Sequence, residues 1–289
     1  MDKIYSGYAN VTLSTADYEK SIVKSARRVL QGFEFFAEYQ HPALASQIAA
    51  NLDLPQSSTS MLLRSLVQLG YLQFDSESRL FEPTLRLSLL SAWRPERVCV
   101  ASAILEVMRK LHDATGQSVQ LAEPYRNCVR YIYVLQSADP DRTLYVPHGT
   151  LRPICSTAFG QVLLTLKSEK EMRSIIARAR LDEDSVDYGV DPDSIMTAVA
   201  RAREHGYAHT SRASGDFEAF QIATLLPQTS GYPPMALGVT SQEQNADKKK
   251  DTLNLMFELL GKKIRHTTLL PPSKGFPDSK TVIPAKSRS

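Results

Sequence analysis

A short helix predicted at residues 55–69 carries polar side chains of types that can read nucleic-acid bases. At 100° per residue, threonine and leucine form an apolar stripe on one side of this helix, and a different side carries polar residues. A glutamine can bond an adenine edge in bidentate fashion, an arginine a guanine edge, and a serine either a base or a phosphate. Residues 54–74 contain no acid, so no carboxylate on this helix would repel phosphate. The candidate readers are Gln56, Ser57, Ser60, Met61 and Arg64.

Three arginines outside this helix are candidates for contacts with a nucleic-acid backbone, which position a protein without reading sequence. Arg79 lies in a predicted hairpin, and Arg27 and Arg28 lie on the first predicted helix. The alternative is a three-helix packing unit whose polar face is merely solvated. That alternative stays open because residues 21–97 carry eight basic side chains against seven acidic ones.

Three helices and a hairpin must position these side chains. Over residues 21–37, apolar side chains recur at three- and four-residue steps, which predicts a first helix. A second helix is predicted over residues 44–53, and Pro55 suits the first position of the third. Gly70 then acts as a C-cap, and residues 71–82 predict a hairpin. This order predicts a winged helix-turn-helix with the hairpin as its wing.

The remainder of the chain predicts a linker helix and a larger mixed domain. Residues 84–115 have a helical pattern that the proline at 95 interrupts. Beyond residue 115, strand-like runs alternate with helical stretches, which predicts an α+β domain. The strand-like runs cover residues 118–122, 129–135, 143–146, 207–211, 220–226 and 235–240, and the helical stretches cover 155–167, 169–180, 192–205 and 246–265.

The composition argues against several classes of protein. The net charge of the 289 residues is only +3, so any affinity for DNA must come from local placement of charge. Cys99, Cys128 and Cys155 lack metal-ligand spacing, and so do the histidines, so we expect no metal and no cofactor. No GxSxG elbow, phosphate-binding glycine loop or GxGxxG is present, so we expect no enzyme activity. Neither a secretory signal nor a run of about 18 apolar residues occurs, so we expect a cytoplasmic protein.

Several motifs, in the same order along the chain, resemble the IclR family of bacterial transcriptional regulators over residues 21–266. Residues 48–59 resemble the family's helix-turn-helix, and residues 66–72 resemble its entry to the wing. Residues 152–164 are similar to the family's most distinctive stretch, and residues 206–208 to another. The resemblance implies an N-terminal winged helix-turn-helix, joined by a linker helix to a C-terminal α/β effector-binding domain. The sheet of that domain is expected to be mostly antiparallel, of the GAF or profilin type.

The chain departs from the family pattern at positions that bear on recognition. The departures in the first domain imply an unusual DNA sequence, and those in the second leave the ligand unassigned. Asp53 replaces a usual glycine, Gln56 a frequent lysine, Met61 a basic or polar reader, Cys155 a histidine, Gln221 a frequent cysteine and Gly238 a serine, and Ser211 lies near a usual acid.

The resemblance implies that an effector binds in a cup between the start of the helix at Cys155 and the facing strands. Unpaired N–H groups and the positive dipole end of a helix N-terminus favour an anion there. Hydroxyls and an amide without a carboxylate suit a small neutral or acidic ligand, although each hydroxyl could instead cap a helix. Arg152 and Arg212 are the nearest cations that could pair with an effector carboxylate, and we rank them below the hydroxyls as ligand contacts. The pocket candidates are Ile154, Cys155, Ser156, Thr157, Ser211, Gln221 and Thr240.

These observations predict a flexible arm at 1–20, a DNA-binding domain at 21–83, a linker helix at 84–96, an effector and oligomerisation domain at 97–268 and a disordered tail at 269–289. We expect a homodimer or tetramer that binds a pseudo-palindromic operator in double-stranded DNA. A small organic acid, aromatic acids included, is expected to modulate that binding and so control a catabolic operon. The alternative is a small-molecule-binding or hydrolytic enzyme domain whose helix-turn-helix serves protein contacts.

Overall fold

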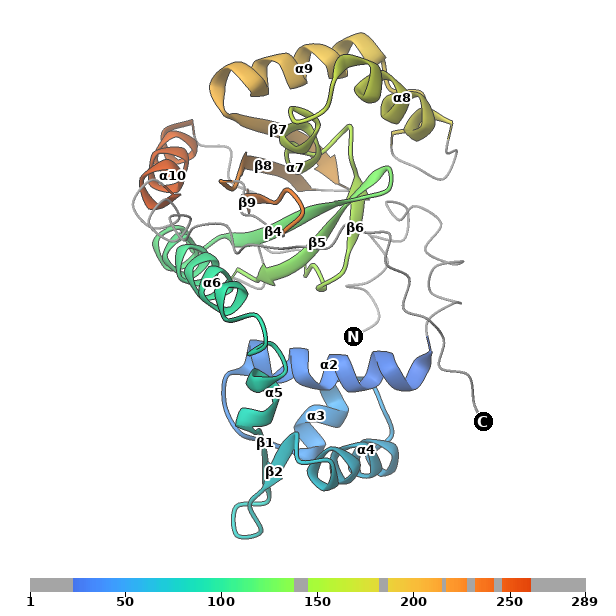
Figure 1. Cartoon of the computed structure of the whole chain (residues 1–289), viewed down its shortest axis with the longest axis vertical. Helices are drawn as coiled ribbons and strands as arrows, with labels where there is room; N and C mark the ends of the chain where they lie inside the picture. The colour runs from blue at the N-terminus through green and yellow to red at the C-terminus, as the bar shows by residue number, and fades with distance from the viewer. Residues whose placement is uncertain are drawn as a thin grey trace.

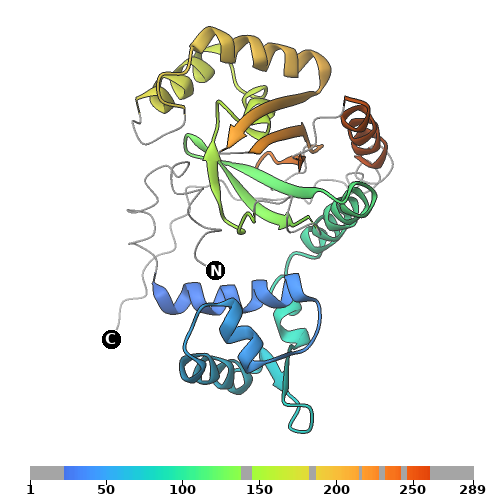
Figure 2. The same ribbon diagram turned by 180° about the vertical axis from the view of Figure 1, so that it is seen from behind.

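The computed structural model describes residues 23–137, 145–181, 187–214, 217–227, 232–241 and 246–260. They form a smaller N-terminal lobe and a larger C-terminal lobe (Figures 1 and 2). The expected arm and tail lie outside the described residues, as does the first half of the strand expected at 143–146.

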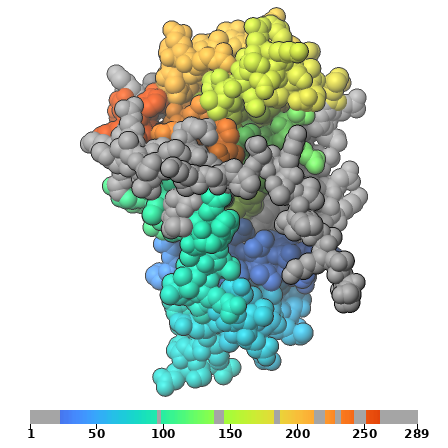
Figure 3. Space-filling view, in the orientation of Figure 1, coloured from blue at the N-terminus to red at the C-terminus, as the bar shows by residue number. Residues whose placement is uncertain are grey.

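The N-terminal lobe is a winged helix-turn-helix with a three-stranded antiparallel sheet in the order β1-β3-β2. Its apolar stripes meet in a single core that contains Phe36, Ile48, Leu63 and Phe81. The hairpin of β2 and β3 is the wing, and it projects furthest from the other lobe (Figure 3). The elements are α2 (Lys24–Tyr39), β1 (Ala43–Leu44), α3 (Ala45–Asn51), α4 (Gln56–Gln68), β2 (Leu72–Phe74) and β3 (Leu80–Pro83).

Two turns of the N-terminal lobe place residues other than glycine in the left-handed region of backbone conformation. Asp53, between α3 and α4, has a φ of 50°, a left-handed conformation that aspartate tolerates better than most residues. Arg79, at the tip of the wing, has a φ of 61°. A side chain with a long polar end therefore occupies a position where glycine would cost less.

The connection between the lobes contains two helices. Helix α5 (Leu85–Leu89) is followed by a turn, and Pro95 then occupies the first turn of α6 (Pro95–Thr115), where its missing N–H costs nothing. The expected interruption near Pro95 is therefore present, and α6 is the long helix that enters the C-terminal lobe (Figure 1).

The C-terminal lobe is built on a six-stranded antiparallel sheet in the order β6-β5-β4-β9-β8-β7. Helices α7, α8 and α9 cover one face, and α6 and α10 cover the other (Figures 1 and 2). The predicted α+β class is confirmed. The elements are β4 (Ser118–Tyr125), β5 (Cys128–Leu135), β6 (Leu151–Pro153), α7 (Ala158–Leu164), α8 (Glu169–Arg180), α9 (Pro192–His205), β7 (Tyr207–Ser214), β8 (Phe217–Leu225), β9 (Ala236–Ser241) and α10 (Ala246–Leu259).

A register shift in the β4–β5 pair changes which residues face each core. The shift lies between Leu121 and Ala122. As a result Tyr131 packs in the core under α7, whereas Tyr133 packs against the core under α6. Strict alternation along β5 would have placed both tyrosines on one face, and a β-bulge breaks that alternation.

Within the described ranges, no helix combines the length and the apolar character needed to cross a bilayer.

Candidate DNA-binding and effector sites

Helix α4 presents the predicted reading face to solvent. Thr59, Leu63 and Leu66 are buried on its inner side. Gln56 and Arg64 are exposed at opposite ends of the outer side, which corresponds to about two turns of helix. The same outer side also carries exposed Ser57 and Met61 and half-buried Ser60. The geometry therefore presents these side chains together, and contacts with base edges remain a prediction.

The wing places a cation next to an aromatic ring at its tip. The guanidinium of Arg79 lies 5.8 Å from the centre of the Phe74 ring, and Arg79 is exposed. Asp75 accepts hydrogen bonds from the Ser78 hydroxyl and the Glu77 backbone N–H, which together lower the pKa of its carboxyl. The turn is thus closed by its own carboxylate, and Arg79 remains exposed for a phosphate.

Arg27 and Arg28 lie on α2, a helix on the side of the domain that faces the C-terminal lobe (Figures 1 and 2). The wing extends from the opposite side. Helix α2 and the tip of the wing therefore lie on opposite sides of the domain, and contact of the two arginines with phosphates remains a prediction.

The start of α7 differs from the expected anion site. The backbone N–H groups of Cys155 and Ser156 donate to the two carboxylate oxygens of Asp187, at 2.9 and 3.1 Å. The Thr157 hydroxyl donates to the Pro153 carbonyl and accepts from the Gly160 N–H, so it caps the helix. Two backbone N–H groups that we expected to hold an effector carboxylate therefore hold a buried carboxylate of the chain itself, and the Thr157 hydroxyl is used within the helix cap.

Cys155 is a buried thiol rather than a reactive one. Burial raises its pKa, and the adjacent charge of Asp187 raises it further. The thiolate is the nucleophilic form of cysteine, and both effects disfavour it. Cys155 and its buried neighbour Ile154 therefore pack the core at the start of α7.

Four polar side chains from four strands meet on the face of the sheet that α7 covers; we call them the polar cluster. The Gln221 amide nitrogen lies 3.2 Å from the Tyr131 hydroxyl and 3.5 Å from the Thr240 hydroxyl, to both of which it donates. Thr240 donates in turn to the Gln120 amide oxygen at 3.1 Å. Gln120 and Tyr131 are each 1% exposed. The polar cluster comprises Gln120, Tyr131, Gln221 and Thr240.

The sequence predicted two members of the polar cluster and missed two. Gln221 and Thr240 were candidates, and the structure brings them together. Gln120 is a fully buried amide, and its position between Val119 and Leu121 in a predicted strand is a signal that the sequence did offer. The side of the sheet on which Tyr131 lies depends on the β-bulge described above, so the sequence alone did not place it in the cluster. Burial raises the pKa of Tyr131 to about 12, so its hydroxyl stays protonated at neutral pH and can donate to a ligand.

Ser211 does not join the polar cluster. It pairs with Phe220 across β7 and β8, and directly opposed residues in an antiparallel pair share a face. Phe220 belongs to the core under α6 and α10. Ser211 therefore faces the opposite side of the sheet from Gln221, which corrects the expectation that both line one pocket.

Phe159 fills the space beside the polar cluster. Its ring centre lies 5.0 Å from that of Tyr131. A Cβ atom added at Gly238 would lie 2.5 Å from Phe159 Cζ, so the ring rests directly on the glycine of β9. A ligand that reaches the middle of this sheet face must displace the ring.

A cavity of about 640 Å³ lies near the C-terminal end of α7, between α8 and the turn that joins β4 and β5. Its apolar lining includes Leu163, Leu164 and Ile175, and its lining also includes the cations Arg126 and Arg178. Its volume falls within the range of small-molecule sites.

Both halves of the chain match models of one protein family. The family described as "IclR helix-turn-helix domain" matches residues 25–76. The family described as "Bacterial transcriptional regulator IclR C-terminal" matches residues 96–261, which is more than half of the chain.

Curated relatives and solved structures agree with these matches. The regulator KdgR of Dickeya chrysanthemi is 22% identical over 197 residues, which is 68% of this chain and 64% of KdgR. The repressor AllR of Escherichia coli K12 is 29% identical over 162 residues, 56% of this chain and 59% of AllR. The chain thus matches less than two thirds of the length of either relative.

The IclR regulator of Alicyclobacillus acidocaldarius has the same fold, with a TM-score of 0.53 and 17% identity over 86% of this chain and 99% of that one. The IclR protein of Thermotoga maritima gives a TM-score of 0.52 and 15% identity over 84% and 98% of the two chains. Together with the two family matches, these likenesses confirm the resemblance seen in the sequence: the chain belongs to the IclR family of bacterial transcriptional regulators.

Proposed function

We propose that this chain regulates transcription by binding DNA through α4 and the wing, and that a small organic acid bound by the C-terminal lobe modulates this binding. The observation that carries the proposal is the exposed, acid-free face of α4 beside an exposed arginine on the wing. Family membership supports it, because the matched relatives are named as regulators or repressors. A catabolic operon in the bacterial cytoplasm is the proposed setting.

The DNA-binding part is tested with duplexes selected from a random library by the wild-type protein. Arg64→Ala and Gln56→Ala are each expected to weaken binding to the selected duplex by about 1–3 kcal/mol, and binding to unrelated DNA much less. Arg79→Ala is expected to weaken both duplexes alike and to make the salt dependence shallower by about one unit of slope. If no duplex is enriched, or if neither Arg64→Ala nor Gln56→Ala weakens binding to an enriched duplex, α4 does not read DNA.

Phosphate contacts by Arg27 and Arg28 are a separate part of the proposal. Their helix lies away from the wing, so these contacts require DNA that extends along the flank of the domain. Replacing both by alanine should then reduce binding to long duplexes and leave the shortest selected duplex unaffected.

The polar cluster supports the effector part of the proposal. Gln221 and Thr240 are hydrogen-bonded to each other beside a protonated phenol, so they can exchange an internal partner for a ligand oxygen. Ile154, Cys155, Ser156 and Thr157 would form the edge of this site rather than its anion-binding centre. Thr240→Val removes a hydroxyl at nearly constant shape and should weaken binding by about 1–3 kcal/mol.

Calorimetry with a panel of aliphatic and aromatic carboxylic acids, and with their amides, tests the ligand class and its location. Thr197→Val is the matched control, because Thr197 lies on α9, away from the polar cluster, and its hydroxyl donates to the Asp193 carbonyl. Binding that survives Thr240→Val and is lost in Arg178→Ala would place the acid in the cavity beside α8. Turnover of an acid by a protein without salt-sensitive DNA binding would favour an enzyme.

A homodimer completes the proposed function, since one winged helix reads only a half-site. Helix α5 and the turn after it expose large apolar side chains that a monomer gains nothing by exposing. They are Leu85, Leu89, Leu90 and Trp93, with Val98 at the start of α6.

A further inference from the structure

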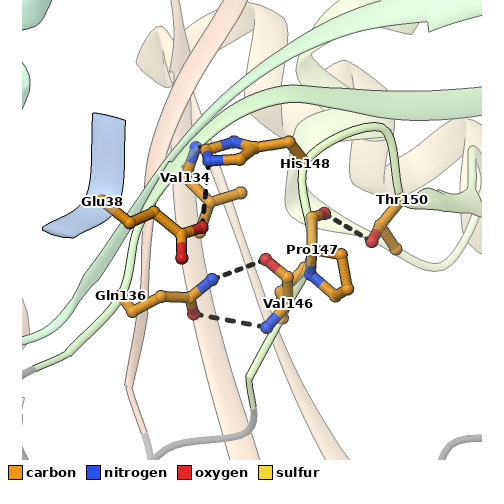
Figure 4. Close-up of polar contacts among 7 residues, drawn as sticks. All are labelled: Glu38, Val134, Gln136, Val146, Pro147, His148 and Thr150. Carbon is orange, nitrogen blue, oxygen red and sulfur yellow. Dashed lines mark hydrogen bonds and ion pairs between the residues drawn. The ribbon is translucent and has the colours of Figure 1, made fainter. Parts of the chain in front are cut away.

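A buried histidine of the C-terminal lobe contacts a helix of the DNA-binding lobe (Figure 4). His148 Nε2 lies 3.2 Å from Glu38 Oε1 on α2, and the His148 side chain is 8% exposed. The other ring nitrogen, Nδ1, lies 3.1 Å from the backbone nitrogen of Val134 on β5. The Val134 N–H can only donate, so Nδ1 accepts and Nε2 carries the ring proton. The neutral ring therefore donates to Glu38, and both of its nitrogens are engaged.

Strand β5 holds the segment that carries this histidine, residues 145–150. The Gln136 side chain donates to the Val146 carbonyl at 2.6 Å and accepts from the Val146 N–H at 3.2 Å (Figure 4). At the other end, the Gly149 N–H donates to the Tyr131 carbonyl at 2.7 Å, and the Tyr131 N–H donates to the Thr150 carbonyl at 2.9 Å. The segment is therefore tied by hydrogen bonds to Tyr131 within β5 and to Gln136 directly after it.

Tyr131 belongs to both networks. Its side chain accepts the hydrogen bond from Gln221 in the polar cluster, and its backbone holds Gly149 and Thr150. A single buried residue thus lies between the proposed ligand contacts and the turn next to His148.

The negative charges of nearby glutamates favour an N–H donor on the His148 ring. Glu34, one helical turn before Glu38, also faces His148, and partial burial is the largest of the effects that raise the pKa of Glu34. The Tyr133 ring centre lies 5.0 Å from that of His148, with the two rings tilted by 33°, and the charge of Arg109 on α6 reaches Tyr133. The two glutamates repel each other, and the His148 N–H offsets that repulsion where α2 meets the C-terminal lobe.

We propose that residues 145–150 relay the state of the polar cluster to α2, with His148 as the positioning residue. This proposal rests on the proposed function and assigns its regulation. A ligand that takes the place of the Gln221–Tyr131 bond moves Tyr131, shifts Gly149 and turns His148 away from Glu38. Because α2 packs against α3, and α3 packs against α4, the reading helix α4 then changes its orientation relative to the C-terminal lobe. The ligand shifts this equilibrium only by its differential affinity for the two arrangements.

The first test needs neither effector nor operator. In protein labelled with ¹⁵N at histidine, the two ring nitrogens of His148 report their protonation and partners by NMR. Tyr131→Phe removes the hydroxyl and leaves the backbone, and we expect it to shift both His148 resonances. Gln221→Leu breaks the same bond from the other side and should give the same shift if Tyr131→Phe folds poorly. Tyr125→Phe, at the far end of β4, is the matched control and should leave the ring unchanged.

Unchanged His148 resonances in both Tyr131→Phe and Gln221→Leu would overturn the relay. This outcome is independent of DNA binding, so it is distinct from failure of the proposed function, in which the wild-type protein selects no duplex.

The second test is a double-mutant cycle on binding to the selected duplex. Glu38→Ala and His148→Gln should each change the Kd by at least about threefold, and the double variant should change it no further than either. Additive effects, or no effect of either variant, would contradict the contact's role in orienting α2. His112→Gln, on α6 and bonded to the Gln117 carbonyl, is the matched histidine control.

Discussion

Asp187 is the residue whose role the sequence concealed most completely. It accepts hydrogen bonds from two backbone N–H groups more than 30 residues earlier in the chain and has no exposed surface. Asp187→Ala removes the acceptor of the buried Cys155 N–H and of the part-buried Ser156 N–H, so we expect a loss of about 1–3 kcal/mol in the free energy of unfolding. Asp187→Asn keeps one acceptor oxygen and should lose less. Urea denaturation measures both, with exposed Asp113→Ala as control; an Ala variant as stable as wild type would contradict this role.

The buried hydroxyl of Tyr131 is expected to make the stability of the protein fall at alkaline pH. Burial raises the pKa of Tyr131 to about 12, whereas an unfolded tyrosine ionises near pH 10. Between these values the folded state holds the proton that the unfolded state has lost, so stability falls as pH rises through this window. Urea midpoints at pH 9 and at pH 11 should therefore differ less in Tyr131→Phe than in wild type. An equal difference in both proteins would mean that Tyr131 ionises freely.

At the scale of single residues, the sequence predicted which side chains are exposed better than it predicted their hydrogen-bond partners. The outer side of α4 is exposed as its 100° periodicity predicted. Gln221 and Thr240 do share one sheet face, but Ser211 faces the other, because face is set by strand register rather than by residue type. Partners such as Asp187 and Gln120 are distant in sequence, and no local pattern pairs them with Cys155 or Thr240.

Helix α7 packs so closely against the backbone of Ile154 that only glycine fits at position 160. A Cβ atom at Gly160 would lie 1.9 Å from the Ile154 carbonyl oxygen, a backbone atom that cannot rotate away. Gly160→Ala should therefore destabilise the protein by about 1–3 kcal/mol or more. Gly32→Ala is the matched control: Gly32 lies inside α2 with no atom within 4 Å of the added carbon. It should stabilise by about 0.5–1 kcal/mol. Equal effects on the urea midpoint would contradict the close approach.

The elements themselves were largely visible in the sequence. Periodicity predicted the three helices and the wing, and α4 begins at Gln56, one residue after the expected proline. The helix expected at 155–167 is shorter, because Asp187 holds Cys155 and Ser156 outside it. The bulge in β5 left no local signal, since it exists only in the pairing of two strands.

At the scale of the whole molecule, the exposed apolar surface of α5 and the following turn predicts how two copies associate. Leu89→Glu should weaken the dimer by on the order of 2 kcal/mol or more, about thirtyfold in Kd, because a buried charge would then lie in the interface. Light scattering coupled to size exclusion, over a dilution series, measures the change. Leu181→Glu is the control, since Leu181 is 79% exposed at the end of α8. A wild-type monomer at every concentration would remove the dimer from the proposal.

The contact of Phe159 with Gly238 also constrains how this protein can diverge. A hydroxyl residue at position 238 would collide with the aromatic ring and with the Ile222 carbonyl, each 2.5 Å from the new carbon. A single substitution at position 238 is therefore expected to disrupt the fold unless Phe159 has first been replaced by a smaller residue and the strands have moved apart. Changes in ligand preference along this lineage must consequently follow an order, with the ring replaced before the glycine. The two positions are expected to vary together among its descendants.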